Sequence, residues 1–284
     1  MTYDAFTLVK DKTIKLLDGN GSVTLVDVGP RVCPDGYTPE FAIVRAARIS
    51  FGLGLKTPIE DERLIRYLIS NKHSSPMEMC NVTLLVKAPL PIMTQFLRHR
   101  TFKFNMFSQR YSEVDEDLGR YDPTKYEHGI RIQSTVNKQG SDKTDNVKEI
   151  KECMDTMNLH LEQIDEMYHK LIDLGCAKEI ARFWLPQCTY STMYMQCDLN
   201  NLIKMLHLRD DPHAQLEIQV YAKAMIELCR PLFPVIFDVY DDMKNGIHLT
   251  GREIKAFVND IPLETNSVSE RKAYEEKKKK LKSE

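Results

Sequence analysis

QFLRHRTFKFNMFSQRYS, residues 95–112, is the stretch around which the rest of the chain is organised. It contains the following basic side chains and no acidic one: Arg98, His99, Arg100, Lys103 and Arg110. Such a cluster repels itself unless an anionic group lies against it, and arginine donates paired hydrogen bonds to phosphate oxygens. Between the basic residues lie aromatic rings that can stack on a flat ligand: Phe96, Phe102, Phe104, Phe107 and Tyr111. The stretch predicts a pocket for a phosphorylated, ring-bearing small molecule, although a solvated basic face or a nucleic-acid-binding surface would have the same composition.

The basic character of this stretch is local. The chain has 284 residues with 39 Lys and Arg against 41 Asp and Glu, which gives a formal net charge of −2. Nucleic-acid-binding domains usually carry a net positive charge, so this balance weakens a general nucleic-acid-binding role. The length allows one large domain or two small ones, and the apolar fraction of 42% allows a sizeable core.

The cysteines and the apolar runs bear on the compartment. The seven cysteines are odd in number and scattered, and they form no Cys-x-x-Cys pair: Cys33, Cys80, Cys153, Cys176, Cys188, Cys197 and Cys229. We expect reduced, mostly buried thiols of a cytoplasmic protein, and neither a disulfide framework nor a metal site. No apolar run approaches the roughly 20 residues of a membrane span. Asp4 also stands where a signal peptide would carry positive charge.

Before the basic stretch, turn and periodicity signals alternate between strands and helices. Asn20-Gly21 is a strong signal for a tight hairpin turn. Thr38-Pro39 is typical of a helix start, with an N-cap hydroxyl and a proline at the first position. The predicted elements are a hairpin over 5–28, helices over 38–48 and 60–71, a strand over 79–87 and a helix over 90–97. The basic residues then lie at the end of that last helix and in the loop beyond it.

After the basic stretch, residues 113–145 read as an extended loop, longer than most loops in compact domains. The clearest helical periodicity of the chain follows, and Gly175 is its natural C-cap. The later predicted elements are helices over 145–174 and 177–185, a strand over 187–196, a helix capped by Asp198, and a helix over 213–230 that starts after Asp211-Pro212.

Together these elements predict an α+β fold. We expect a single domain over 1–245, with an antiparallel or mixed sheet packed against several helices, including the long one near 145–174. Residues 246–284 read as a charged C-terminal extension that ends in a solvated, frayed helix rich in Glu and Lys.

The basic stretch also resembles a family signature. Arg98-His99-Arg100, seven residues and then Ser108 match the Arg-His-Arg-x7-Ser motif of the flavin-dependent thymidylate synthases. Four further blocks resemble that family in the family's order: Arg45–Ser50, His73–Glu78, Ala181–Pro186 and Leu208–Gln219. The similarity therefore covers most of the chain, from about residue 40 to about residue 240.

The resemblance implies a reaction. The family converts dUMP to dTMP, with 5,10-methylenetetrahydrofolate as carbon donor, FAD as hydride carrier and usually NADPH as reductant. It uses no cysteine nucleophile, so the protein must instead stabilise negative charge on the pyrimidine with cationic donors. No cysteine lies in the basic stretch or beside Arg209, as that chemistry requires. The resemblance also implies a cytoplasmic homotetramer whose active sites are shared between subunits, with dUMP as ligand and with no membrane or nucleic acid as partner.

The resemblance also assigns residues, and it implies no metal ligand. Arg209 matches the catalytic arginine that contacts uracil and favours ionisation of N3; the alternative is a surface arginine paired with Asp210 or Asp211. Ser108 is expected to donate to phosphate, since a serine without a base partner is a poor nucleophile. The implied dUMP-binding residues are Gln95, Phe96, Arg98, Met106, Ser108, Gln109, Arg110, Arg182 and Arg209. The implied FAD-binding residues are His73, Ser75, Arg98, His99, Arg100, Asn105, Met106, Asn200, Lys204 and His213.

Some positions depart from the family pattern. Met106 stands where an acid is usual, Lys103 where a serine is usual, and Lys204 where an asparagine is usual. The usual Asn-Ala-Arg run reads Asp198-Leu199-Asn200 here. These departures leave open a relative that binds FAD or nucleotide without turnover. A nucleic-acid-binding module that uses the basic stretch and the lysine-rich tail is the other alternative.

Overall fold

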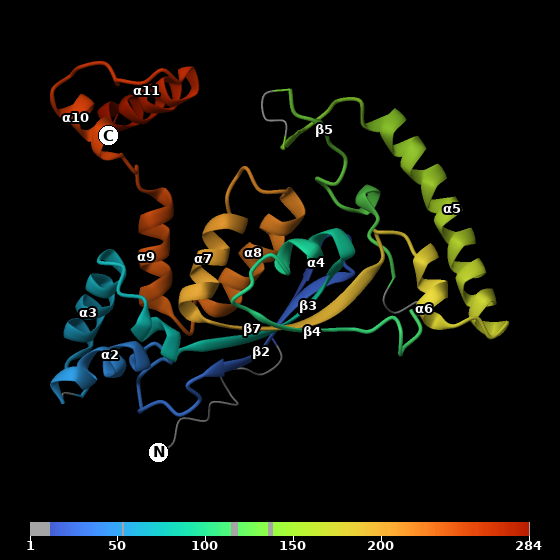
Figure 1. Ribbon diagram of the computed structural model, residues 1–284, viewed down its shortest axis with the longest axis horizontal. Helices are drawn as coiled ribbons and strands as arrows, with labels where there is room; N and C mark the ends of the chain where they lie inside the picture. Colours follow the sequence, from blue (N-terminus) through green and yellow to red (C-terminus); the bar gives the residue numbers. More distant parts are fainter. Residues whose placement is uncertain (1–11, 53, 115–118, 136–138, 284) are drawn as a thin grey trace. The chain divides into compact units, whose positions relative to one another are not determined.

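The computed structural model describes residues 12–52, 54–114, 119–135 and 139–283 (Figure 1). In it the chain forms two compact units, one ending at Phe237 and the other beginning at Asp238. The first unit contains the sheet, the helices packed against it and every residue predicted to bind a ligand.

An antiparallel sheet is the centre of the first unit. Among the described residues it has five strands, in the order β1 (Lys12–Leu16), β2 (Gly21–Gly29), β3 (Asn81–Pro89), β7 (Tyr190–Asp198) and β4 (Lys103–Met106). The predicted hairpin is confirmed, because Leu16 of β1 pairs with Gly21 of β2. Its turn spans residues 17–20, so Gly21 is already the first residue of β2 and the turn lies slightly before the predicted Asn20-Gly21 position. Its first residues, 5–11, lie outside the described residues. The strands predicted at 79–87 and 187–196 are confirmed with small shifts at their ends.

β4 is an element that the sequence does not predict. A loop is expected after the helix at 90–97, but Phe104 and Met106 pair with Met195 and Met193 of β7. That expectation is wrong because the pairing partner lies about 90 residues further along the chain, outside any local pattern. The basic stretch therefore passes from the end of a helix into the edge strand of the sheet.

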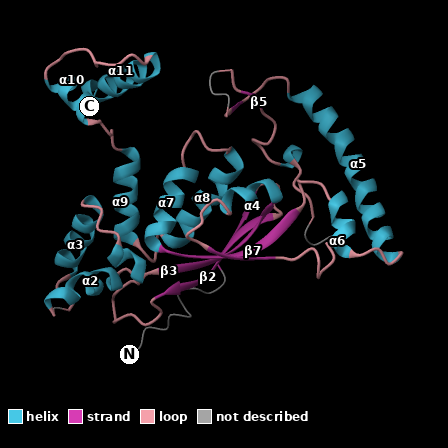
Figure 2. Ribbon diagram, in the orientation of Figure 1, coloured by secondary structure: helices cyan, strands magenta, loops and turns pink. Residues whose placement is uncertain are grey.

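Helices cover one face of this sheet. Alternate residues of the strands are buried beneath them, including Val82, Leu84 and Val86 of β3 and Met193 of β7. The covering helices are α4 (Leu90–Phe96), α7 (Leu199–Arg209) and α8 (Leu216–Cys229), which lie over the strands in Figures 1 and 2. On the other face Tyr194 is 49% exposed, so the sheet has one apolar side, as is usual for antiparallel sheets. The α+β class with an antiparallel sheet is confirmed.

Helix α8 starts later than the sequence predicts. Asp211-Pro212 is the expected start, but the helix begins at Leu216 with Gln215 as N-cap. The Asp211 carboxylate instead accepts a hydrogen bond from the backbone N–H of His213 at 2.7 Å, which closes a turn. The prediction is wrong because Asp before Pro favours a turn as readily as a helix start. The residues after Arg209 are therefore a compact turn.

The N-terminal helices lie beside the sheet. They are α2 (Phe41–Arg48), the 3-10 segment η1 (Ile49–Phe51) and α3 (Pro58–Ser70), followed by the 3-10 segment η2 (Ser75–Met79). α2 begins at Phe41, three residues after the predicted Thr38 cap, which instead accepts in a turn through its backbone carbonyl. α3 starts with a capping box between Thr57 and Glu60.

The long helix is confirmed as α5 (Val147–Asp173), and the segment before it is only partly irregular. Gly175 has a φ of +81° and follows the helix end, where Gly175 and Cys176 donate to the carbonyls of Ile172 and Leu171. The predicted helix at 177–185 is shorter than expected, with α6 (Lys178–Ala181) followed by the 3-10 segment η4 (Arg182–Trp184). The predicted extended loop contains η3 (Pro123–Lys125) and a ladder of β5 (Ile132–Gln133) with β6 (Ser141–Asp142).

The C-terminal unit has its own small core. α9 (Pro234–Asn245) runs across the division between the units, and α10 (Gly251–Val258) and α11 (Val268–Ser283) follow it. Tyr274 of α11 is completely buried against Ala256 and Leu263. The predicted charged, largely exposed helix is confirmed as α11, but it is not frayed, because Tyr274 anchors it.

No helix in the described part of the chain combines the length and apolar content of a membrane span. The cysteines are free thiols, with Cys33, Cys80, Cys197 and Cys229 buried.

Candidate functional site

Arg209, the predicted catalytic residue, is held in place by two neighbouring elements. It is the last residue of α7, a helix whose start is capped by the Asp198 carboxylate, which accepts from the backbone N–H of Asn201 at 2.9 Å. The Arg209 Nε donates to Nε2 of His99 at 3.1 Å, and its Nη2 donates to the backbone oxygen of Gln95 at 3.1 Å. The guanidinium thus joins the end of α7 to the end of α4.

His99 is neutral at this position. Burial, and then the positive charge of Arg209, lower the pKa of His99 to about 4. Since Nε2 accepts from Arg209, the single ring proton of the neutral imidazole is on Nδ1. The place of His99 in the sequence suggests that it adds to the positive charge of the basic stretch. It instead carries no charge and acts as a hydrogen-bond acceptor.

Arg209 is not paired with any acid among residues 12–52, 54–114, 119–135 and 139–283. Within the described residues it forms no ion pair with Asp210 or Asp211, and Asp211 instead pairs with His213 at 2.8 Å. The alternative of a surface arginine neutralised by its neighbours is therefore wrong. Burial and the nearby charge of Arg98 lower the pKa of Arg209, so two guanidiniums lie close enough to repel each other. An anionic ligand would relieve that repulsion.

A second group of predicted residues lies beyond β4. Phe107 packs against the cluster of Val114, Tyr168 and Ala181, which anchors the start of this segment. Arg110 is 54% exposed at its side chain and pairs with Glu179 of α6 at 3.1 Å. Arg182, at the start of η4, is half-buried, so α6 brings Arg110 and Arg182 into one region of the surface.

Ser108 has no activating partner in the part of the chain that the structure describes. Its hydroxyl accepts from the backbone N–H of Arg110 at 3.4 Å, and no histidine or carboxylate of the described chain hydrogen-bonds to it. It therefore lacks the base that a serine nucleophile needs. The amide Nε2 of Gln109 is buried without a hydrogen-bond partner, which leaves a donor available beside Ser108.

Some of the residues predicted to bind FAD form a third group, and the others lie at separate positions. His73 and Ser75 are exposed at η2, which packs against α7, the helix that carries buried Asn200 and exposed Lys204. Asn105 is exposed on β4, opposite Tyr194.

Two predicted residues lie elsewhere. His213 is in the turn after α7. Phe96 is completely buried and contacts Tyr221 edge to face at 6.0 Å, so its ring belongs to the core.

The cation chemistry of these groups fits a flavin dinucleotide. Arg98, Arg100 and Lys204 are exposed, and none of them forms an ion pair within the described residues, so each can donate to a pyrophosphate. Asn200 and Ser75 add neutral donors at the η2–α7 contact. In the described part of the chain, no group of three or more His, Cys, Asp or Glu side chains is placed to hold a metal ion.

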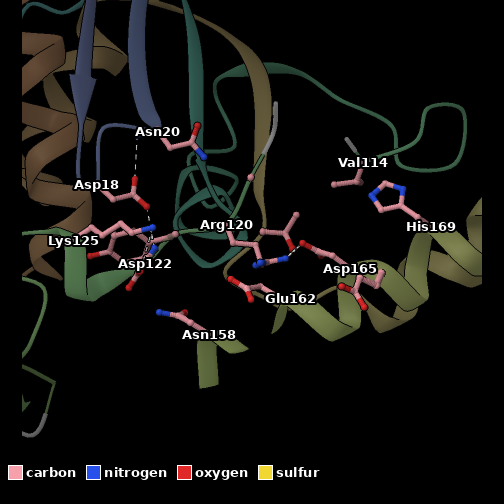
Figure 3. A pocket seen from close by; sticks show the side chains of 14 residues that line it. Asp18, Asn20, Val114, Arg120, Asp122, Lys125, Asn158, Glu162, Asp165 and His169 are labelled. Carbon is pink, nitrogen blue, oxygen red and sulfur yellow. Dashed lines mark hydrogen bonds and ion pairs between the residues drawn. The ribbon is translucent and has the colours of Figure 1, made fainter. Parts of the chain in front are cut away.

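None of the predicted ligand-binding residues lines the larger cavities of the described chain. One of about 630 Å³ is between the β1–β2 turn and α5, where Arg120 pairs with Asp165 and Lys125 lies near Asp122 (Figure 3). Another of about 570 Å³ is an apolar hollow along α5. A third, of about 830 Å³, is lined by Arg131 and Gln215. The predicted ligand-binding residues therefore form open surfaces in one chain and not an enclosed cavity.

Gln215 and Glu217 also belong to this region, although the sequence assigns them no role. Gln95 Nε2 donates to Oε1 of Gln215 at 2.8 Å, and Gln215 Nε2 donates to Oε2 of Glu217 at 2.8 Å. The signal that points to Glu217 is a lone acid on the apolar face of a helix, beside Ile218 and Tyr221, because a buried charge requires a partner.

Comparison with known proteins agrees with this arrangement. The family model described as "Thymidylate synthase complementing protein" matches residues 35–235. The flavin-dependent thymidylate synthase of Dictyostelium discoideum is 38% identical over 263 residues, covering 92% of this chain and 85% of that protein. That of Treponema denticola is 38% identical over 251 residues, covering 88% of this chain and 90% of that protein.

A solved structure agrees as well. The UMP/dUMP methylase PolB from Streptomyces cacaoi, bound with 5-Br dUMP, has a TM-score of 0.65 and 31% identity, covering 77% of this chain and 94% of that chain. The resemblance carried by the Arg98-His99-Arg100 motif is thus confirmed: the chain belongs to the thymidylate synthase complementing protein family, that of the flavin-dependent thymidylate synthases.

Proposed function

We propose that this protein converts dUMP to dTMP with FAD as cofactor, 5,10-methylenetetrahydrofolate as carbon donor and NADPH as reductant. The observation that carries the proposal is the Arg209 guanidinium, fixed by His99 and Gln95 without an acidic partner among the described residues. Such a group can stabilise negative charge on a ligand without first breaking an ion pair with a carboxylate of the protein.

Arg209 and its neighbours serve the pyrimidine end of the substrate. With Nε and Nη2 engaged, the other donor positions of the fork remain for the uracil carbonyl and N3. A cation at N3 favours its ionisation, and the negative charge spreads through the ring to activate C5. Arg98, close enough to affect the pKa of Arg209, adds to that positive field.

Arg110, Arg182, Ser108 and Gln109 serve the phosphate end. The Arg110–Glu179 pair is half-exposed on both sides, and such pairs contribute only about 0–1 kcal/mol. A phosphate dianion can therefore take the place of Glu179. Ser108 donates to the phosphate and does not attack the substrate, because its hydroxyl has no base partner within the described chain.

The FAD pyrophosphate is assigned to Arg98, Arg100 and Lys204, with His73, Ser75 and Asn200 beside it. When bound, FAD supplies the hydride of the reaction. The protein then needs no cysteine nucleophile, and its buried thiols are poor candidates. Burial raises the pKa of Cys80 and of Cys229 to about 12, so both stay protonated.

A homotetramer with shared active sites is part of the proposal. The exposed apolar residues along α5 and after it support an interface between copies: Met157, Met167, Leu174, Phe183 and Trp184. The three groups of site residues are open surfaces in one chain, which is what a site completed by a neighbouring copy requires. We assign residues 1–245 to this catalytic domain and 246–284 to a charged extension, and we expect a cytoplasmic protein without a membrane or nucleic-acid partner.

The test is direct. The purified protein should show the visible absorbance of bound flavin, and dUMP, 5,10-methylenetetrahydrofolate and NADPH should together give dTMP. Omission of any one of the three should stop product formation. A colourless protein that takes up no FAD, or a yellow one that makes no dTMP, would contradict the proposal. In the second case the protein is a binding relative without turnover.

A further inference from the structure

A chain of hydrogen bonds leads from a buried carboxylate to the side chain of Gln95, a residue that also contacts the predicted catalytic arginine through its backbone. Glu217 accepts from Gln215, and Gln215 accepts from the side chain of Gln95, each at 2.8 Å. The backbone oxygen of the same Gln95 accepts from Arg209 at 3.1 Å. The side-chain amide of Gln95, which is predicted to contact dUMP, is therefore oriented by Gln215 and Glu217.

Glu217 is a fixed anchor for this chain. It is only 4% exposed, and its Oε1 accepts from Arg131 Nη2 at 2.6 Å and from the Tyr121 hydroxyl at 3.3 Å. Burial alone would raise the pKa of Glu217, but the hydrogen bond and charge of Arg131, with the hydrogen bond from Gln215, lower it overall. The carboxylate stays ionised, so each oxygen remains an acceptor and the Gln215 amide has one favourable orientation.

Arg131 and Tyr121 are in turn held by the segment predicted as an extended loop. Arg131 also donates to Ser141 Oγ at 2.9 Å and to the backbone oxygen of His128. The Tyr121 backbone N–H donates to the carbonyl of Cys188 at 2.8 Å, just before β7. Burial and then the neighbouring Glu217 raise the pKa of Tyr121, so its hydroxyl keeps the proton that it donates. The end of the chain of bonds opposite Arg209 is therefore rigid.

We propose that Arg131, with Tyr121, is a positioning residue for the nucleotide site and acts on Gln95 through Glu217 and Gln215. Without Arg131, Glu217 loses its charged partner and Gln215 loses its fixed acceptor, so the Gln95 amide can rotate. The Gln95 side chain then contacts dUMP less well, while its backbone oxygen, held in α4, still accepts from Arg209. This inference rests on the proposed function, since it assumes that Gln95 and Arg209 face dUMP.

The test measures the affinity of the FAD-loaded protein for dUMP. The change in flavin absorbance on dUMP addition reports the binding. Arg131→Met should weaken dUMP binding about tenfold, the range expected for coupling through a shared hydrogen-bond network. Arg131→Lys should restore part of that loss, because it returns a charge and a donor. Unchanged dUMP affinity in Arg131→Met would overturn the inference.

A double-mutant cycle tests the route. In a Gln95→Ala background, the further effect of Arg131→Met on dUMP affinity should shrink to less than about twofold, because the connecting amide is gone. A full tenfold further loss would show that Arg131 acts by another route and would overturn the proposal. Tyr121→Phe, which removes a single hydrogen bond, should weaken binding about twofold to threefold and is available if Arg131→Met fails to fold.

Arg48→Met is the matched control. The Arg48–Asp61 pair is as buried as Arg131–Glu217, with side chains 9% and 8% exposed against 15% and 5%. Its loss should lower the melting temperature but leave dUMP affinity unchanged. If Arg48→Met weakens dUMP binding as much as Arg131→Met, the effect is general destabilisation and the inference fails. If the unmodified protein binds no dUMP, the proposed function fails instead, and the two failures are thus distinguishable.

Discussion

Arg209 and Arg110 are both predicted to bind the nucleotide, but their surroundings differ. Arg209 is fixed by His99 and by the Gln95 backbone, has no acidic partner within the described residues and is partly buried. Arg110 is mostly exposed and pairs with Glu179, which is exposed to a similar extent. One guanidinium is therefore held in position before a ligand arrives, and the other is occupied by an exchangeable partner.

The difference matches the task of each end of the nucleotide. Charge that develops on the pyrimidine is best stabilised by a group that does not reorganise during the reaction. A phosphate is already ionised, so it needs binding and not activation, and it can displace a weak surface partner. We expect the two arginines to fail in different ways when they are removed.

Arg209→Ala is expected to have the largest effect. Removing a charge-stabilising donor commonly costs about 10²–10³-fold in kcat, and we expect a loss in dTMP formation at the upper end of that range. Flavin should remain bound, because Arg209 is assigned to uracil. Turnover and the visible spectrum of the same preparation check both statements. Arg66→Ala, which removes a half-buried arginine paired with Glu62 on α3, is the matched control. Loss of FAD from Arg209→Ala would assign this residue to the cofactor.

Arg110→Ala and Glu179→Ala should act in opposite directions. Arg110→Ala should raise KM for dUMP about tenfold with little change in kcat, because a phosphate contact of this kind contributes to binding in the ground state and the transition state alike. Glu179→Ala should lower KM about twofold, since it frees Arg110 from a weak pair. Steady-state kinetics with varied dUMP measure both. A rise in KM for Glu179→Ala would mean that the pair orients Arg110 for binding and does not compete with phosphate.

The arginine motif and most of the framework around it can be predicted from the sequence. The N-terminal hairpin, the long helix ended by Gly175 and the Asp198 cap of α7 depend on neighbouring residues, so local patterns suffice to predict them. The order of the motif blocks is also visible in the sequence. The resemblance assigns Gln95 and Arg209 to dUMP and His99 to FAD, and the structure joins all three by hydrogen bonds.

What the sequence does not predict depends on contacts between distant residues. β4 is a strand because β7 pairs with it. Phe96 belongs to the core, where its ring contacts Tyr221 edge to face. The neutral state of His99 follows from its burial and from Arg209, which is 110 residues away in the chain. Arg131 lies in a segment that looks irregular, and its role is visible only when Glu217 is placed beside it.

Ser108→Ala tests the phosphate end of the site with a smaller expected effect than Arg110→Ala. The loss of one hydrogen bond to phosphate should raise KM for dUMP about threefold and leave kcat nearly unchanged. Steady-state kinetics check this expectation, with Ser112→Ala as a control in the same turn. A fall in kcat of about 10³-fold would instead make Ser108 a nucleophile, which the lack of a base partner among the described residues argues against.

The neutral state of His99, which accepts a hydrogen bond from Arg209, also predicts that the stability of the protein depends on pH. The folded pKa of His99 is lowered to about 4 from the ordinary 6.5, so the unfolded chain takes up a proton before the folded chain does. The contribution of His99 to stability is therefore complete above about pH 6.5 and is lost as the pH falls from there toward 4. His99→Gln keeps an acceptor for Arg209 but does not titrate. Between pH 6.5 and 4.5 the melting temperature of the unmodified protein should fall further than that of His99→Gln, by on the order of 2 °C. Parallel curves for the two proteins would mean that His99 is not held neutral by its burial and by Arg209. The surroundings of the two arginines would then differ less than their hydrogen bonds indicate.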